Sequence, residues 1–210
     1  MEMIAVFVGI FILCYLIGGV NGAILMSKLL HHEDIREKGS GNPGFTNYKR
    51  VYGMSFAAAI VMMFDIVKTA IPVALTMIVT NNMWGIGQFG AAFAGLACML
   101  GHCFPVWYKF KGGKAFMAGF ATIWFVDWRM ALIASGVFFI VLFSTWYMSV
   151  SSCAASLTCP VALAFLHPAS VWVLVLSAVS ALLVIVRHAS NFKKLAQGTE
   201  SKFTIGHKKA

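Results

Sequence analysis

Apolar residues fill most of the chain in seven segments, which short polar stretches separate. The segments lie at about residues 3–25, 54–80, 84–103, 113–126, 130–149, 154–167 and 169–187. A helix needs about 20 apolar residues to cross a bilayer, so the first three segments and the fifth are long enough to cross alone. The fourth and sixth are short, as in tilted, broken or half-buried helices. The pattern predicts an all-α polytopic membrane protein of one domain, residues 1–210, with about seven transmembrane helices.

Turn residues are expected where these segments meet. The joints are Asn81–Asn82, Asp127–Arg129 and His167–Pro168, because Asn, Asp and Pro favour turns and helix ends. A loop without basic residues is expected between residues 149 and 154. The bulk composition agrees with a membrane protein: 60% of the residues are hydrophobic, the mean hydropathy is +0.84, and only 11% are charged.

The basic residues indicate which way the helices face. With seven spans, 14 of the 16 lysines and arginines fall on one side, in residues 28–53, 109–114 and 187–209. Positively charged loops remain in the cytoplasm. We therefore expect the N-terminus outside and the C-terminus in the cytoplasm. In a soluble protein a net charge of +9 would suggest nucleic acid; here loop retention and binding of anionic lipids or phosphates account for it.

Five cysteines are present, an odd number with no Cys-x-x-Cys pair. Most lie in or beside apolar runs, so we expect buried thiols and neither disulfides nor a metal site.

The first basic loop is rich in glycine and short polar residues. Gly39, Gly41 and Gly44 permit positive φ, which lets backbone N–H groups converge on an anion, and Arg50 can bind a phosphate through two hydrogen bonds. The polar side chains between them are Ser40, Asn42, Thr46 and Asn47. The loop is either a phosphate site or a flexible turn.

The second basic loop carries Gly112-Gly113 between Lys111 and Lys114. At the start of a helix this arrangement suits an anion. It lacks the spacing of a P-loop, and a cytoplasmic loop with interfacial aromatic residues is the alternative interpretation.

The last apolar segment leads into Arg187, His188 and Asn191. In a continuous helix these residues share one face. The histidine is a proton carrier, a phosphate donor or an interfacial residue with satisfied hydrogen bonds. Three such loops on one side of the membrane favour a shared phosphate site.

These loops, in this order, resemble the motifs of the PlsY family, the bacterial membrane acyl-phosphate:glycerol-3-phosphate acyltransferases. The similar residues are Ser40-Gly41-Asn42, Gly44, Thr46-Asn47 and Arg50; Gly101-His102, Phe104-Pro105 and Lys111-Gly112-Gly113-Lys114; and Arg187-His188, Asn191, Leu195, Gly198 and Glu200. Asp65 and Lys68 also fit a recurring Asp-x-x-Lys pair, which we interpret as structural.

The resemblance implies transfer of a fatty acyl group from acyl phosphate to the 1-hydroxyl of glycerol 3-phosphate. The products are lysophosphatidic acid and phosphate, and no metal or other cofactor is expected. The enzyme is expected to act as a monomer in the bacterial cytoplasmic membrane, with its site facing the cytoplasm and membrane lipid, but no nucleic acid, as a partner. Because acyl phosphate is already activated, no acyl-enzyme intermediate is needed.

The resemblance also implies roles for the motif residues. The expected catalytic residues are Ser40, Arg50, Lys114, His188 and Asn191, and those expected to bind substrate are Gly41, Asn42, Gly44, Thr46, Asn47, His102, Lys111, Gly112, Gly113 and Arg187. The residues from Ser40 to Asn47 would hold acyl phosphate, with His102 nearby. Arg50, Lys111 and Lys114 would hold glycerol phosphate, and His188 or the substrate's own phosphate would take the hydroxyl proton. Glu200 is expected to be structural.

Three stretches depart from the family pattern. Ala115-Phe116-Met117-Ala118 stand where Gly-Val-Ala-Thr is common, Gly18-Gly19-Val20-Asn21 replace a Gly-Ser-Ile-Pro-like turn, and Phe45 replaces a small residue. Two other functions remain open, because the fourth and sixth apolar segments are short and the run after Lys114 is altered. One is a transporter or flippase for a phosphorylated solute or lipid, and the other is a catalytically inactive relative that binds anionic lipid.

Overall fold

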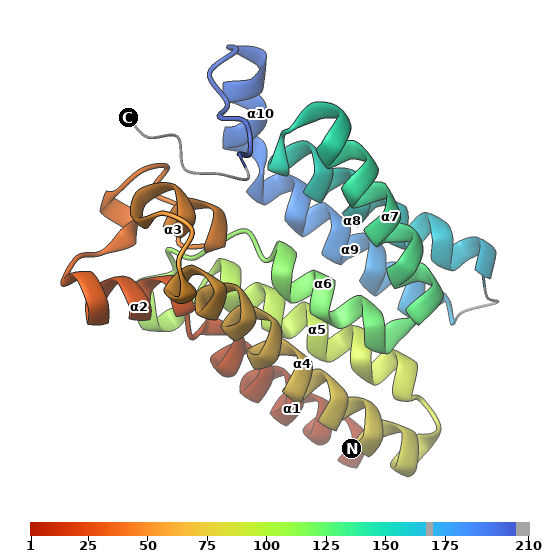
Figure 1. Cartoon of the computed structure of the whole chain (residues 1–210). Coiled ribbons are helices and arrows are strands. Elements are labelled where there is room, and N and C mark those ends of the chain that lie inside the picture. The colour runs from red at the N-terminus through yellow and green to blue at the C-terminus, as the bar shows by residue number, and fades with distance from the viewer. Residues whose placement is uncertain (167–169, 205–210) are drawn as a thin grey trace.

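The computed structural model describes residues 1–166 and 170–204, and every regular element in this part of the chain is a helix (Figure 1). The longer helices are α1 (Glu2–Gly19), α4 (Phe56–Trp84), α5 (Gly87–Cys103), α6 (Phe116–Val126), α7 (Trp128–Thr145), α8 (Met148–Leu166) and α9 (Val171–Arg187). Shorter elements are α2 (Gly22–His31), η1 (Ile35–Glu37), α3 (Phe45–Tyr52), η2 (Val106–Tyr108) and α10 (Ala189–Ala196). The all-α prediction is confirmed.

Five helical stretches of the described chain are long and apolar enough to cross a membrane: Glu2–His31, Phe56–Trp84, Gly87–Tyr108, Trp128–Thr145 and Met148–Leu166. A sixth results if α9 and α10, which meet at 49°, are taken together. The 11 residues of α6 extend over only ~17 Å at 1.5 Å per residue, about half the thickness of a bilayer core. The count of seven complete spans stays a prediction.

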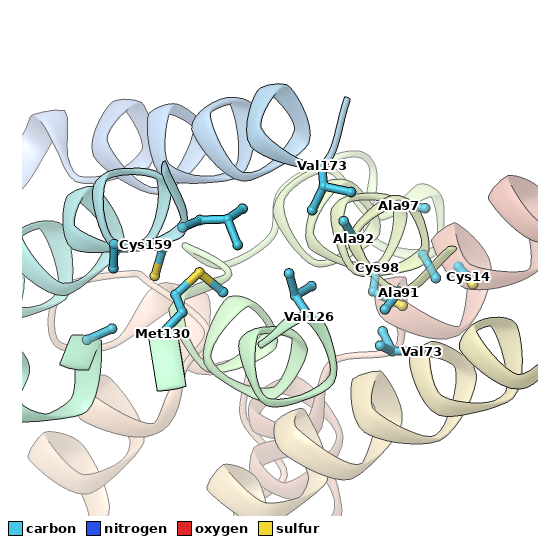
Figure 2. Packing of buried hydrophobic residues seen from close by; sticks show 14 residues of the cluster. Cys14, Val73, Ala91, Ala92, Ala97, Cys98, Val126, Met130, Cys159 and Val173 are labelled. Carbon is cyan, nitrogen blue, oxygen red and sulfur yellow. The ribbon is translucent and has the colours of Figure 1, made fainter. Parts of the chain in front are cut away.

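The bundle packs α1 and α4 against α5, and α7 and α9 against α8, while α6 joins the two groups. Figure 1 places α3 and α10 at the end of the bundle away from the N-terminus. Figure 2 shows the buried cluster between the groups. Val126 lies in its middle, with Val73, Ala91 and Cys98 to one side. Met130 and Cys159 lie to the other side. Buried side chains thus connect the two groups of helices.

Small residues bring α1 and α5 into backbone contact. A Cβ added to Gly18 would lie 2.4 Å from the carbonyl oxygen of Cys98, and one added to Gly101 would lie 2.0 Å from that of Tyr15. Such approach between membrane helices depends on small residues. The five cysteines are all buried and unpaired, as expected.

The first apolar segment differs from its prediction because it breaks at Val20–Asn21. The Asn21 side chain accepts a hydrogen bond from the Ile24 N–H at 3.0 Å and so caps α2. Its amide also donates to the carbonyl of Pro43 at 3.0 Å. The residue that replaces the family's turn proline therefore anchors the glycine-rich loop.

Two predicted joints are wrong. Asn81 and Asn82 lie inside α4, which ends at Gly85 with a φ of 68°. The loop expected at 149–154 is helical, because α8 begins at Met148; within it, the Ser151 hydroxyl donates to the Tyr147 carbonyl one turn earlier at 2.9 Å. The predicted joint at Asp127 is confirmed, since its carboxylate caps α7. The joint at His167–Pro168 lies outside the described residues.

Candidate active site

A polar cavity of about 120 Å³ lies among α3, the ends of α5 and α9, the starts of α6 and α8, and the C-terminal segment. Eleven of the expected site residues line it: Ser40, Asn42, Gly44, Thr46, Asn47, Arg50, His102, Lys114, His188, Asn191 and Glu200. Residues from three separate loops therefore meet at one place.

The other five expected residues lie elsewhere. Gly41, Gly112 and Arg187 line a neighbouring depression that also includes Lys114 and Asn191. Gly113 lies against the ring of His102. Lys111 is exposed and lines neither space, so the structure does not bring it to the site.

The glycine-rich loop is held by its own hydrogen bonds. Gly39 and Gly41 adopt the expected positive φ, at 58° and 74°. The N–H groups do not converge on the cavity, however: that of Gly41 donates to Lys38 at 3.0 Å, and that of Gly44 donates to Asn42 at 3.0 Å. The expected backbone cradle is thus wrong at these positions. Side chains of the loop remain to contact an anion.

Asn47 supports this loop from beneath and is almost fully buried. Its side-chain oxygen accepts the Ser40 N–H at 2.8 Å, and its amide donates to Ile35 and Lys38 carbonyls at 3.3 Å and 3.0 Å. All of its strong hydrogen-bonding groups thus have protein partners. Asn47 was expected to bind substrate, but its hydrogen bonds instead hold Ser40 in place.

A chain of polar contacts crosses the cavity. The Lys114 ammonium donates to the Asn191 side-chain oxygen, and the Asn191 amide donates to a Glu200 carboxylate oxygen at 2.6 Å. Ser149 of α8 donates to the same oxygen at 3.1 Å. The carboxylate therefore orients the amide, which supports the structural role expected of Glu200.

Burial lowers the pKa of Lys114 to about 8. The Glu200 carboxylate raises that pKa in part, whereas the positive charges of Lys194 and Arg50 lower it further. A cation with this pKa is sensitive to an incoming phosphate, whose charge would stabilise the protonated form.

His188 is buried, and its Nδ1 lies 2.8 Å from the Val184 carbonyl. A carbonyl only accepts hydrogen bonds, so Nδ1 carries the proton and Nε2 of the neutral ring is free to accept one. This geometry suits a general base.

The continuous helix that would align Arg187 with Asn191 is interrupted at His188, because α9 ends at Arg187. Arg187 instead turns to the second loop and donates to the carbonyls of Gly113 at 3.0 Å and Gly112 at 3.1 Å. Its guanidinium also lies 5.1 Å from the centre of the Phe104 ring. The arginine thus fixes the loop that carries Lys114.

The two glycines of that loop permit close approach of the backbone, and the N–H of Gly113 is used within the protein. The Gly113 N–H donates to the His102 carbonyl at 3.0 Å. A Cβ on Gly112 would lie 2.1 Å from the same carbonyl oxygen. Since α6 begins only at Phe116, the predicted anion site at a helix N-terminus is wrong here.

Known proteins resemble the chain over nearly its whole length. The family model for glycerol-3-phosphate acyltransferase matches residues 8–198. The chain belongs to the glycerol-3-phosphate acyltransferase family. A member from Thermoanaerobacter sp. (strain X514) is 38% identical over 91% of this chain and 92% of the relative. One from Neisseria meningitidis serogroup B is 35% identical over 90% and 92%.

Solved structures agree with the family assignment. The glycerol 3-phosphate form of PlsY (YgiH), an integral membrane glycerol 3-phosphate acyltransferase, has a TM-score of 0.84 and 31% identity, covering 94% of this chain and 96% of that one. Its lysophosphatidic acid form has a TM-score of 0.81 and 30% identity, covering 94% and 95%. The resemblance to PlsY is confirmed, and so is the expectation of an integral membrane fold.

Several cavity residues of this acyltransferase were absent from the expected set. Ser149 and Ser152 line the cavity from α8, and Ser201, Lys202 and Phe203 line it beyond the residues that the family model matches. The serines sit in an apolar run and the tail has no motif, so no pattern in the sequence marked them. Asp65 also lines the cavity, beyond the structural role expected for it.

Proposed function

We propose that the protein transfers a fatty acyl group from an acyl phosphate to the 1-hydroxyl of sn-glycerol 3-phosphate. The products are lysophosphatidic acid and inorganic phosphate. The observation that carries the proposal is the meeting of Arg50, Lys114, His188 and Asn191 around one polar cavity. The glycerol 3-phosphate and lysophosphatidic acid forms of the related PlsY support the acceptor and the product.

Both substrates carry phosphate, and three cationic side chains line the cavity: Arg50, Lys114 and Lys202. Arg50 approaches it from α3 and Lys114 from the loop before α6, and Ser40, Asn42 and Thr46 add neutral donors. Cations aimed at the charge that develops in the transition state lower the barrier, because they are already oriented. In this site they would bind the phosphates and stabilise the departing one.

The chemical step needs one base. The hydroxyl oxygen forms a bond to the acyl carbonyl carbon, the bond between that carbon and the phosphate oxygen breaks, and phosphate leaves with the electron pair. The hydroxyl proton passes to the unprotonated Nε2 of His188, which lines the cavity. A phosphate oxygen of the substrate is the other group that can accept the hydroxyl proton in this reaction.

An apolar cavity of about 50 Å³ lies between α5, α6, α7, α8 and α9. Phe116 lines both this space and the polar cavity. We assign the acyl chain to it. Met99 and Met130 stand in its wall, and flexible methionine side chains adapt readily to an entering chain.

The membrane arrangement we propose has seven crossings in a single domain, with the N-terminus outside and the site facing the cytoplasm of a bacterial cell. The basic residues of the three loops support it through the positive-inside rule. A soluble glycerol phosphate then reaches the cavity directly. C-terminal fusions test this: green fluorescent protein should fluoresce and alkaline phosphatase should be inactive, and the reverse result would contradict the orientation.

The central experiment adds glycerol 3-phosphate and acyl phosphate to the detergent-solubilised protein and measures lysophosphatidic acid and phosphate. We expect both in equal amounts, with activity in Arg50→Ala and Asn191→Ala lower by at least ~100-fold. Acyl-CoA and acyl carrier protein replace the donor in parallel reactions. No product from any donor would favour an inactive relative or a transporter, and full activity in either variant would remove that residue from the site.

A further inference from the structure

Lys68 is a buried lysine in the middle of α4, and its ammonium has three acceptors. Nζ lies 2.7 Å from Asp65 Oδ1, 2.7 Å from the Val20 carbonyl oxygen and 3.0 Å from His102 Nδ1. An ammonium group has three N–H donors and no acceptor. The ammonium thus has hydrogen-bond contacts with the Val20 carbonyl and with His102 Nδ1, and it forms an ion pair with Asp65.

This accounting determines the protonation state of His102. Because Lys68 can only donate, Nδ1 of His102 must accept, and it therefore carries no proton. The ring is then neutral, with its proton on Nε2. The nearby Asp65 carboxylate forms an ion pair with the same ammonium at 2.7 Å.

The Nε2 edge of His102 faces Gly113. A Cβ at Gly113 would lie 2.1 Å from Nε2, so any side chain larger than that of glycine would block this edge. The histidine lines the polar cavity and is otherwise buried. Its backbone carbonyl also accepts a hydrogen bond from the Gly113 N–H at 3.0 Å, and this bond holds the second basic loop beside the ring.

We propose that Lys68 is a positioning residue that locks His102 as an Nε2–H donor to a phosphate or carbonyl oxygen of the substrates. The proposal rests on the proposed function and assigns a role to a pair first interpreted as structural. His102 and His188 then hold opposite tautomers in one cavity. His188 has a free Nε2 acceptor for a proton, whereas His102 offers a proton that it keeps.

The tautomer is measurable without substrate. In protein labelled with ¹⁵N-histidine, the signal that disappears in His102→Gln belongs to His102. We expect an unprotonated Nδ1 and a protonated Nε2 for His102, and the opposite pattern for His188. A protonated Nδ1 on His102 overturns the proposal whatever the enzymatic activity.

The role of Lys68 requires a variant that leaves no unpaired buried charge. Asp65→Asn combined with Lys68→Met removes both charges together. Elution as a single species in detergent and an unchanged His188 signal show that this variant is folded. We expect the His102 signal to become a mixture of tautomers and kcat to fall at least ~10-fold, with a smaller change in KM. An unchanged His102 tautomer in the folded double variant overturns the positioning role. If the double variant does not fold, Lys68→Arg is measured instead. Arginine also only donates hydrogen bonds, so a protonated Nδ1 of His102 in Lys68→Arg overturns the positioning role.

Two amide substitutions separate donation from base catalysis. The Gln amide nitrogen can stand near the place of Nε2, whereas that of Asn stands near Nδ1. We expect His102→Gln to retain activity within ~10-fold of the unsubstituted enzyme and His102→Asn to lose at least ~100-fold, the effect of removing one oriented donor. Equal large losses overturn the donor role. If the unsubstituted protein makes no lysophosphatidic acid, the proposed function fails while the tautomer measurement still decides the structural assignment.

Discussion

Lys114 and Asn191, which are 77 residues apart in the chain, meet through a hydrogen bond from the lysine ammonium to the asparagine side-chain oxygen. This contact joins the second basic loop to α10. Asn191 cannot turn its amide group without losing its hydrogen bond to Glu200 at 2.6 Å. The carboxylate thus determines which face of the amide meets the lysine.

The pKa of Lys114, lowered to about 8 by burial, predicts how activity depends on pH. The lysine is charged below this pKa and neutral above it, so binding of phosphate weakens as the pH rises. We expect kcat/KM for glycerol 3-phosphate to fall above about pH 8. Lys114→Arg should move the falling limb beyond pH 10, because arginine stays charged.

Glu200 provides an internal control for this assignment. Its charge raises the pKa of Lys114, so Glu200→Gln should move the falling limb to lower pH. If Lys114→Arg leaves the limb where it was, another group causes the pH dependence.

Gly113 predicts a steric effect at the site. Gly113→Ala would place a methyl group 2.1 Å from His102 Nε2, so the ring or the loop must move. We expect at least ~100-fold lower activity, since small displacements in an active site have effects of this size. Gly136→Ala is the matched control, because a Cβ there meets nothing within 4 Å. Equal activity in both variants would show that the loop tolerates the methyl group.

The sequence predicted the helices well because their apolar segments are long. It failed where a polar side chain changed the path of the backbone. A loop was expected at residues 149–154, but the chain is helical there, and the Ser151 hydroxyl bonds within its own helix. The apolar segment ends at residue 187, but the sequence did not show that the helix bends there or that Arg187 turns to Gly112 and Gly113.

The candidate site divides in the same way. The motifs correctly brought Arg50, Lys114 and Asn191 to one cavity. The residue types alone could not separate groups that face the cavity from those that hold its walls. Asn47 and Arg187 are polar in the sequence, yet their hydrogen bonds go to the protein. Lys111 has the same charge as Lys114 and is exposed.

Arg187 is therefore expected to act on stability more than on binding. Arg187→Lys removes the paired donors to Gly112 and Gly113 and should lower the free energy of unfolding by ~1.5–3 kcal/mol, the range for hydrogen bonds to a charged group. Thermal unfolding in detergent measures this, together with KM for glycerol 3-phosphate. A large rise in KM without loss of stability would restore the substrate-binding role that the sequence suggested.

Ala115 predicts a stabilising substitution. Its φ is 57°, a left-handed conformation that costs an alanine ~1–2 kcal/mol, and the family pattern has glycine there. Ala115→Gly should relieve this strain, although glycine's greater freedom in the unfolded chain offsets ~0.4–1 kcal/mol of the gain. We expect a net gain of up to ~1 kcal/mol, seen as a higher midpoint of thermal unfolding. A lower midpoint would show that packing of the buried methyl group outweighs the strain.

Phe203 predicts a role for the tail that follows the matched family residues. Its N–H donates to the Trp146 carbonyl at 2.7 Å, and its ring centre lies 4.0 Å from the Lys49 ammonium. Lys49 also donates to the Thr204 carbonyl. These contacts hold the tail against α3, beside Arg50, where Phe203 forms part of the cavity wall.

Loosening this wall should weaken binding of the soluble substrate. A cation–π contact at such a site contributes ~0.5–1 kcal/mol, so we expect Phe203→Ala to raise KM for glycerol 3-phosphate ~2- to 5-fold, with kcat nearly unchanged. Lys49→Met should have a similar effect, and the double variant little more, because the two changes remove one shared contact. Phe192→Ala, on the exposed face of α10, is the matched control. Independent, multiplying effects of Phe203→Ala and Lys49→Met would mean that the tail and α3 act on the substrate separately.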